Sequence, residues 1–231
     1  MATYDHGIPS GLGKTMGMRD EPTSRYYILT NKGKPMSGDV YAGFRKYNVL
    51  DYRSPVETFD MSAIDDAIDY ANRLVERGMQ GEPVGADEVT VSVFRAYQDA
   101  RVIEVFEELR SRDALVEGDA PGIYRLSPAV SNLPVQIVIM GELEGEDNLF
   151  WRALSDKANK SDMEQAIRRV YMLEDEQRAG DGRTYIETIL RGNPDLALEI
   201  FDDAEMAYML CDILGLGEKA GHPVASSTLG A

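Results

Sequence analysis

The order of the predicted elements indicates an α/β protein with a mixed β-sheet flanked by helices, followed by a C-terminal helical appendage. Three observations lead to this prediction. Short runs rich in Val, Ile and Tyr alternate with amphipathic helical segments as far as about residue 145. Residues 134–140 are almost continuously apolar, as in a strand that is buried on both faces. From Asp147 onward the pattern is helical.

The strands and helices of the α/β part follow one another in a β, β, α, β, α, hairpin, β order. Strands are predicted at 25–30, 47–55, 88–97 and 134–140, with a hairpin over 115–126. Helices are predicted at 62–77 and 101–112, where apolar residues recur every three or four positions. Ser62 is the expected cap of the first helix and Gly78 its stop. This order predicts a mixed sheet.

The C-terminal part is predicted to contain only helices. One helix spans 148–155, and a long helix spans 161–178 and opens on a capping-box pattern from Ser161 to Glu164. A break follows at 179–182, and then helical pieces at 185–190, 195–201 and 204–214. We therefore divide the chain into a flexible tail (1–20), an α/β core (21–145), a helical region (146–214) and a second tail (215–231).

The composition excludes several classes of protein. The chain of 231 residues has 40 acidic and 24 basic residues, a formal net charge of −16 that repels a polyanion at long range. A single cysteine, Cys211, excludes an internal disulfide, and no apolar run approaches the ~18 residues of a membrane span. The two histidines, His6 and His222, lie in the tails, which argues against a histidine zinc site or a Ser-His-Asp triad. We expect a cytoplasmic protein that does not associate with membranes.

Residues 7–15 look like a phosphate-binding loop but do not have its spacing. The loop pattern requires glycine where this chain has Ile8, and no strand can precede it. We assign this stretch to the N-terminal tail.

The strand at 47–55 places an acid and a base on the same face. Side chains of a strand alternate between its two faces, so Asp51 and Arg53 lie side by side. Two interpretations follow. The carboxylate can hold Mg²⁺ and the guanidinium a phosphate oxygen, which makes a charged site at the end of a strand. Alternatively, the two residues form a surface salt bridge on a half-exposed strand.

Several short motifs resemble the PD-(D/E)XK nuclease superfamily, in particular its bacterial recombination-promoting or transposase-like branch. The motifs occur in the same order as in that branch and cover roughly residues 20–175: 44–55 (FRKYNVLDYRSP), 68–71 (IDYA), 89–95 (VTVSVFR), 122–124 (GIY) and 134–139 (PVQIVI). The resemblance implies a restriction-endonuclease-like fold.

The resemblance also implies roles for individual residues. Asp51 takes the place of the second metal-binding carboxylate and Arg53 that of the catalytic lysine, so both are candidate catalytic residues, with Mg²⁺ as the cofactor of an active enzyme. The first aspartate position falls near Tyr26. Glu21, in an acidic-Pro pair, or Asp39 would then have to supply the missing first carboxylate. Arginine is a poor proton acceptor, so the site departs from the family pattern.

Further side chains are candidates for binding nucleic acid. Arg45 and Lys46 are close to Arg53 in sequence and are compatible with a local basic groove. Tyr70 is retained from the family pattern, although core packing also explains it. Trp151 is expected to be a packing anchor in preference to a platform for a stacked base.

Two hypotheses of function remain open. The first is a Mg²⁺-dependent DNA phosphodiesterase, or a degenerate member with impaired cleavage. The alternative is a non-catalytic regulatory or protein-interaction module built on the nuclease fold. The net charge disfavours DNA as a partner, whereas a protein partner or a homo-oligomer suits the C-terminal helices.

Overall fold

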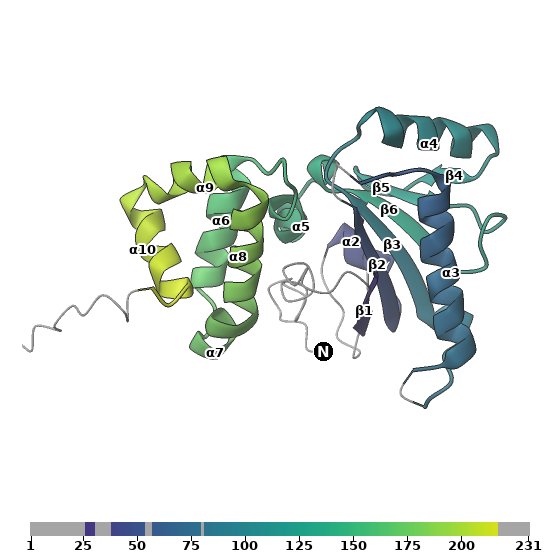
Figure 1. Cartoon of the computed structure of the whole chain (residues 1–231), viewed down its shortest axis with the longest axis horizontal. Coiled ribbons are helices and arrows are strands. Elements are labelled where there is room, and N and C mark those ends of the chain that lie inside the picture. Colours follow the sequence, from purple (N-terminus) through teal and green to yellow (C-terminus); the bar gives the residue numbers. More distant parts are fainter. Residues whose placement is uncertain (1–25, 31–37, 54–56, 80, 217–231) are drawn as a thin grey trace, which may run out of the picture.

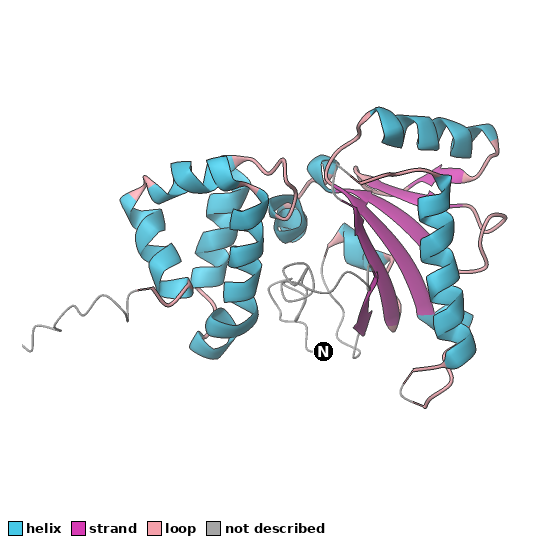
Figure 2. Cartoon of the chain, viewed as in Figure 1, coloured by secondary structure: helices cyan, strands magenta, loops and turns pink. Residues whose placement is uncertain are grey.

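The computed structural model describes residues 26–30, 38–53, 57–79 and 81–216. These residues form an α/β protein with a six-stranded mixed sheet flanked by helices, as the sequence predicted at this level (Figure 1). Figure 2 shows the described strands in one half of the molecule and only helices in the other half. The predicted tail at 1–20, the pattern at 7–15, Glu21 and residues 217–231 lie outside the described residues.

The described strands form a sheet with the order β1-β2-β3-β6-β5-β4. The neighbours β2, β3 and β6 are parallel, whereas the other pairs are antiparallel. Every residue of β3 and β6 is buried, and so is all of β2 except Tyr52, which explains their Val- and Ile-rich sequences. The strands are β1 (Tyr26–Thr30), β2 (Tyr47–Arg53), β3 (Val89–Arg95), β4 (Leu115–Glu117), β5 (Ile123–Leu126) and β6 (Val135–Ile139).

Helices cover both faces of the sheet. The helices α3 (Met61–Arg77) and α4 (Ala100–Ser111) follow β2 and β3 and pack on one face of the sheet (Figure 1). Ile64 and Phe106 of these helices are buried in the core on that face. The helices α2 (Asp39–Ala42) and α5 (Leu149–Ala153) pack on the other face. Short 3₁₀ turns at Ala86–Glu88, Met140–Glu142 and Glu146–Asn148 connect these elements.

The cap of α3 is Asp60, so the prediction of Ser62 was wrong. Asp60 Oδ1 accepts the backbone N–H of Ala63 at 3.0 Å and the hydroxyl of Ser62 at 2.7 Å. The helix begins one residue earlier than predicted, so Ser62 lies inside the first turn, where its hydroxyl supports the capping carboxylate.

The helix α2 was not predicted, and polar contacts with the sheet hold it in place. The hydroxyl of Thr90 donates to the carbonyl of Gly43 at 2.9 Å, and the amide of Gln136 donates to the carbonyl of Val40 at 3.1 Å. Gly43 permits this approach, because a Cβ there would lie 2.4 Å from Gln136 Oε1. Burial of these polar groups fixes a segment whose own sequence has no helical periodicity.

The C-terminal helices differ from the prediction in one stretch. The helix α6 (Lys160–Tyr171) is capped by Asn159 and stops well before residue 178, so the predicted Ser161 cap and the long helix were wrong. Three acids at 174–176 would lie at the negative end of such a helix, whereas here they begin the short α7 (Asp175–Gln177). The predicted break at 179–182 was also wrong, since Arg178–Gly182 is a π-helical turn.

The remaining helices continue from this turn. They are α8 (Arg183–Gly192), α9 (Pro194–Phe201) and α10 (Ala204–Ile213). The π-helical turn packs closely on α6, because a Cβ at Gly182 would lie 2.8 Å from Val170 Cγ1. The absence of a side chain at position 182 therefore lets the chain stay helical there.

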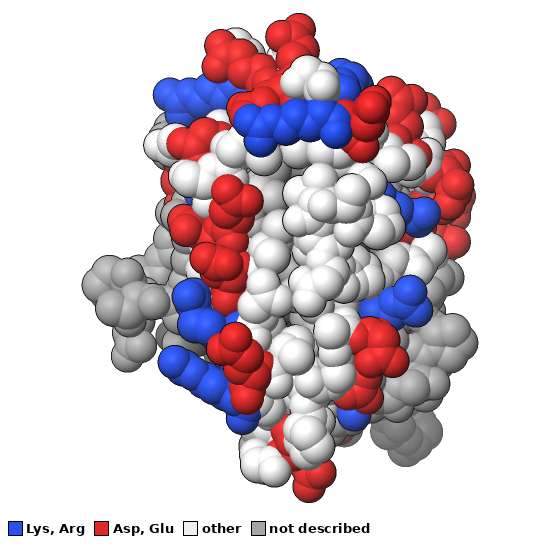
Figure 3. All heavy atoms as spheres, turned by 90° about the vertical axis from the view of Figure 1, so that its right-hand side faces the viewer, with Lys and Arg blue, Asp and Glu red and all other residues white. Residues whose placement is uncertain are grey.

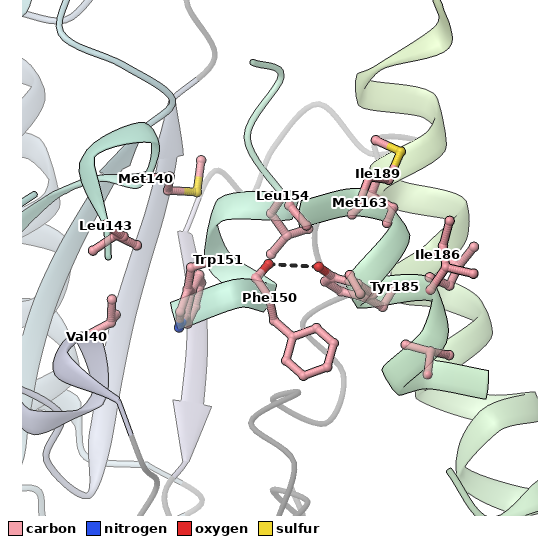
Figure 4. Close-up of a cluster of buried hydrophobic side chains, with 14 of the residues drawn as sticks. Val40, Met140, Leu143, Phe150, Trp151, Leu154, Met163, Tyr185, Ile186 and Ile189 are labelled. Atoms are coloured by element: carbon pink, nitrogen blue, oxygen red, sulfur yellow. Dashed lines mark hydrogen bonds between the residues drawn. The ribbon is translucent and has the colours of Figure 1, made fainter. Parts of the chain in front are cut away.

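The helix α5 connects the sheet to the C-terminal helices (Figure 4). Trp151 is buried and stacks on Phe94 of β3, with ring centroids 4.6 Å apart. Its neighbour Phe150 contacts Tyr185 of α8 edge-on, and the Tyr185 hydroxyl donates to the Phe150 carbonyl at 2.9 Å. The prediction that Trp151 is a packing anchor is confirmed. One hydrophobic cluster therefore spans both halves of the described chain.

Candidate functional site

Asp51 and Arg53 lie near the carboxyl end of β2, on the face covered by α3 and α4. Arg53 Nε donates to Asp51 Oδ2 at 2.7 Å, so the prediction that the two share one face is confirmed. Their side chains are 3% and 0% exposed. The expected surface salt bridge is therefore wrong, because α3 and its preceding loop cover this face of the strand.

The guanidinium of Arg53 also binds the main chain around the start of α3. Its two terminal nitrogens donate to the carbonyls of Thr58, at 3.2 Å, and Ala63, at 3.1 Å. The side chain thus ties the end of β2 to the loop before α3 and to the first turn of that helix. All three of its nitrogens have acceptors within the fold, an arrangement that satisfies a buried cation.

A second buried arginine lies beside the first. Arg95 ends β3 in register with Arg53, and one of its terminal nitrogens donates to the Arg53 carbonyl at 3.3 Å. The other donates to Asp99 Oδ2 at 2.7 Å, and the guanidinium lies 5.3 Å from the centroid of the Phe59 ring. Asp99 caps α4 by accepting the Val102 N–H at 3.0 Å. Arg95 therefore connects β3 to the start of α4 as Arg53 connects β2 to α3.

Sequence reasoning missed Arg95 and Asp99. A signal was present, because Arg95 follows an alternating run of valines, and side-chain alternation puts it on the face of Val91 and Val93. We name the four residues Asp51, Arg53, Arg95 and Asp99 the β2–β3 charge cluster. Its two cations and two anions balance, and each guanidinium contacts one of the carboxylates.

Tyr26 is the direct cross-strand partner of Asp51. The residue that stands at the expected first aspartate position is thus adjacent to Asp51 but carries a phenol. Its ring stacks on that of Tyr70 in α3, with centroids 4.6 Å apart and planes at 29°. Tyr70 is half-buried and belongs to the packing between β1 and α3, which agrees with the core-packing interpretation.

The structure does not bring Asp39, one of the two predicted partner carboxylates, to Asp51. Asp39 begins α2 on the opposite face of the sheet, and its carboxylate accepts from the Asn148 amide at 2.9 Å. Glu21 lies outside the described residues. Within the described ranges there is no group of three His, Cys, Asp or Glu side chains that fits a metal ion. With Arg53 bound to the Asp51 carboxylate, the described residues do not fit Mg²⁺.

Arg45 and Lys46 lie at the other end of β2. Lys46 precedes Asp51 by five positions, which corresponds to about 16 Å along an extended strand. Lys46 Nζ is 2.9 Å from Glu88 Oε1, and this contact raises the pKa of Lys46 and lowers that of Glu88. Arg45 is exposed. The structure therefore does not bring these two cations together with Arg53 in one basic groove.

The charges on the face that carries α3 and α4 are of mixed sign. In Figure 3 the visible Lys and Arg side chains are interleaved with Asp and Glu around an uncharged central band. No continuous basic stripe crosses the visible part of this face. The arrangement lacks the electrostatic footprint that nucleic-acid-binding surfaces present.

A hollow of about 370 Å³ lies between the end of β6 and the connection from α5 to α6. Arg152 lines it and binds Asp162 with two nitrogens, at 3.0 and 2.8 Å, while Asn159 donates to Asp162 at 2.8 Å. These groups satisfy one another and fix the start of α6. The paired side chains that line the hollow therefore have a structural role.

No protein-family model matches the sequence, and no curated protein and no solved structure shows significant similarity to the chain. Among the helices of the described residues, none combines the length and the apolar character needed to cross a bilayer.

Proposed function

We propose that this chain is a restriction-endonuclease-like protein that does not cleave nucleic acid and that acts as a protein-interaction module. The described architecture supports the first part. A central strand with Asp51 near its carboxyl end is followed by a helix and a parallel strand, and Tyr26 is paired with Asp51 on the neighbouring antiparallel strand. These are the positions at which the nuclease pattern has its carboxylates.

The bonding of Arg53 carries the proposal. A residue in the place of the catalytic lysine would have to face the attacking water and the scissile phosphate. Here Arg53 as a whole residue is 2% exposed. The nitrogens of its guanidinium bind Asp51, Thr58 and Ala63. The acid and the base of the motif stabilise the fold instead of presenting a charged surface.

The charge of the chain supports an interaction role over nucleic-acid binding. A net charge of −16 repels a polyanion, and the visible α3–α4 face has no basic stripe. An acidic protein with exposed apolar residues on its C-terminal helices is suited to binding another protein.

The test is a cleavage assay with the full chain. Plasmid DNA, single-stranded DNA and RNA are incubated with the protein in Mg²⁺ and, separately, in Mn²⁺. We expect no metal-dependent cleavage by the wild-type protein or by Asp51→Asn. Asp156→Asn, which changes a carboxyl outside the motif, is the matched control, and circular dichroism reports whether each variant is folded. Cleavage that a folded Asp51→Asn loses and Asp156→Asn retains would contradict the proposal.

A metal-dependent DNA phosphodiesterase is the second candidate. It is favoured by the pairing of Tyr26 with Asp51, since Glu21 stands only five residues before Tyr26 in the sequence. In this case Glu21→Gln should abolish Mg²⁺-dependent cleavage, whereas Glu57→Gln, at another acidic position, should preserve it. Wild-type protein that is inactive in both metals rules this candidate out.

A further inference from the structure

The helix α9 exposes large apolar side chains that do not contribute to the core. Leu198 and Phe201 are 69% and 39% exposed, whereas Ala197 and Ile200 of the same helix are buried against the C-terminal core. Residues three apart lie on the same side of a helix, so Leu198 and Phe201 form one apolar surface. Nothing in the folding of α9 itself requires this surface to be apolar.

Acidic side chains surround these two residues. Asp195, Glu199 and Asp202 are exposed, and among the described residues none of them forms an ion pair. The sequence has no Lys or Arg from 192 to 216. We name Asp195, Leu198, Glu199, Phe201 and Asp202 the α9 patch.

The acids of the neighbouring helices have a different environment. Arg168 of α6 binds Glu205, and Arg183 of α8 binds Glu187 at 3.0 Å. Arg178 contacts both Asp175 and Asp212. Negative charge without an ion-pair partner among the described residues therefore gathers on α9, where it adjoins exposed apolar area.

We propose that the α9 patch is the docking surface for a basic amphipathic helix of a partner protein. Such a helix presents an apolar stripe to Leu198 and Phe201 and flanks it with Lys or Arg that face Asp195, Glu199 and Asp202. This inference rests on the proposed interaction role and names the chemistry of the partner. It does not depend on whether the chain cleaves nucleic acid.

Charge complementarity disfavours a second copy of the chain, nucleic acid, anionic lipid and residues 217–231 as occupants. In a two-fold symmetric dimer the same patch contributes to both sides, so two α9 patches would bring acids against acids. Nucleic acid and anionic lipid are repelled for the same reason. The C-terminal residues 217–231 contain one acid, Glu218, and one base, Lys219, and supply no net positive charge.

The experiment measures binding of a fluorescent synthetic peptide of Leu and Lys by anisotropy. The peptide is about 18 residues long, enough for a helix in water, and its leucines follow helical spacing. A scrambled peptide of the same composition separates patterned docking from general attraction to an acidic protein. We expect the wild-type chain to bind the patterned peptide at least about tenfold more tightly than the scrambled peptide. Added salt should weaken this binding.

Variants locate the binding. Leu198→Gln with Phe201→Ser should weaken binding at least about tenfold, a typical loss for apolar anchors. Ile103→Gln with Val130→Ser is the matched control, because these side chains are 45% and 41% exposed on the α/β half. It should leave the affinity within about twofold, which corresponds to a neutral surface change.

Charge is tested separately. Asp195→Asn with Asp202→Asn should weaken binding and reduce its salt dependence, whereas Glu174→Gln with Glu176→Gln should leave the affinity close to that of the wild-type chain.

Three results would overturn the proposal: equal affinity for the scrambled peptide, equal losses in the α9 and control variants, or a dimer in gel filtration that Leu198→Gln with Phe201→Ser dissociates. Failure here is distinguishable from failure of the proposed function. An enzyme that cleaves yet binds the peptide contradicts only the non-catalytic role. A chain that neither cleaves nucleic acid nor binds the patterned peptide contradicts only the assignment of the α9 patch.

Discussion

The β2–β3 charge cluster and the α9 patch hold charge in opposite ways. In the cluster, Arg53 and Arg95 are buried and bound by carboxylates and carbonyl oxygens of the fold. In the patch, the carboxylates of Asp195 and Asp202 are exposed and have no ion-pair partner among the described residues. The difference separates charges that hold the protein together from charges that remain available to a second molecule.

The energetic reason for the difference is desolvation. A buried ion costs several kcal/mol unless its partners replace the lost water, so a fold that buries Arg53 must also engage its hydrogen-bond donors. An exposed carboxylate incurs no such cost and can exchange water for a cation of a partner. A motif that looks catalytic in the sequence can therefore be fully occupied by its own fold.

The largest expected effect comes from removing one half of the buried pair. Asp51→Ala leaves the Arg53 guanidinium buried without its carboxylate, and we expect a loss of about 3–5 kcal/mol in the free energy of unfolding. Urea denaturation measures it. A loss below about 1 kcal/mol would mean that the pair behaves like a solvent-exposed salt bridge, and the contrast with the α9 patch would not hold.

A double variant sharpens this result. Replacing both partners, as Asp51→Leu with Arg53→Met, removes the uncompensated charge and should recover most of the loss. The recovery will be incomplete, because the carbonyls of Thr58 and Ala63 lose a donor. If the loss in the double variant equals the sum of the losses measured for Asp51→Leu alone and Arg53→Met alone, the two charges do not interact.

An intermediate effect is expected at the second arginine. Asp99→Ala removes the cap of α4 and the partner of Arg95, and we expect a loss of about 2–4 kcal/mol. Asp99→Asn keeps an oxygen for the cap and loses only the charge, so it should cost less. Thermal unfolding of both variants checks the order, and an equal loss in the two would assign the whole effect to the ion pair.

The smallest effect concerns Asp156, which follows α5. Burial raises the pKa of this carboxyl, and the positive charges of Lys157 and Arg95 lower it in part. The folded pKa of Asp156 is above the unfolded value of about 3.9. The stability that the protonated carboxyl contributes is therefore fully present only below about pH 3.9, and it is lost as the pH rises through the folded pKa. Asp156→Asn should therefore unfold at higher urea than wild type at pH 7 and equally at pH 3.

The exposed Asp66→Asn in α3 is the control for this pH dependence. Its urea midpoint should follow that of the wild-type protein at both pH values. A lower midpoint for Asp156→Asn at pH 7 would mean that the ionised carboxyl stabilises the fold, contrary to the expected sign.

The sequence predicted the strands and the helices α3 and α4 because their apolar periods are strong. The Val- and Ile-rich runs of β3 and β6 indicate buried strands, and the apolar stripe of α3 indicates an amphipathic helix. The short α2 was missed, since its position depends on Thr90 and Gln136, which are distant in the chain. The end of α6 was missed because its periodicity continues past the acids that interrupt it.

For the site, local pattern predicted less. The two-residue period of a strand was sufficient to place Asp51 and Arg53 on one face. It did not predict their burial, which depends on how the loop before α3 folds back onto β2. Arg95 and Asp99 were missed because their pairing joins a strand end to a helix cap, and neither pattern alone indicates the other.

The stacking of Trp151 on Phe94 has a consequence for how this protein comes apart. A chain that stopped at residue 145 would leave the Phe94 ring and its apolar neighbours facing water, and helices without the sheet would lose the other side of the same contact. Neither half should survive alone. Heating or denaturant should instead unfold both halves in a single step, so a destabilising substitution in either half should lower the stability of the whole chain.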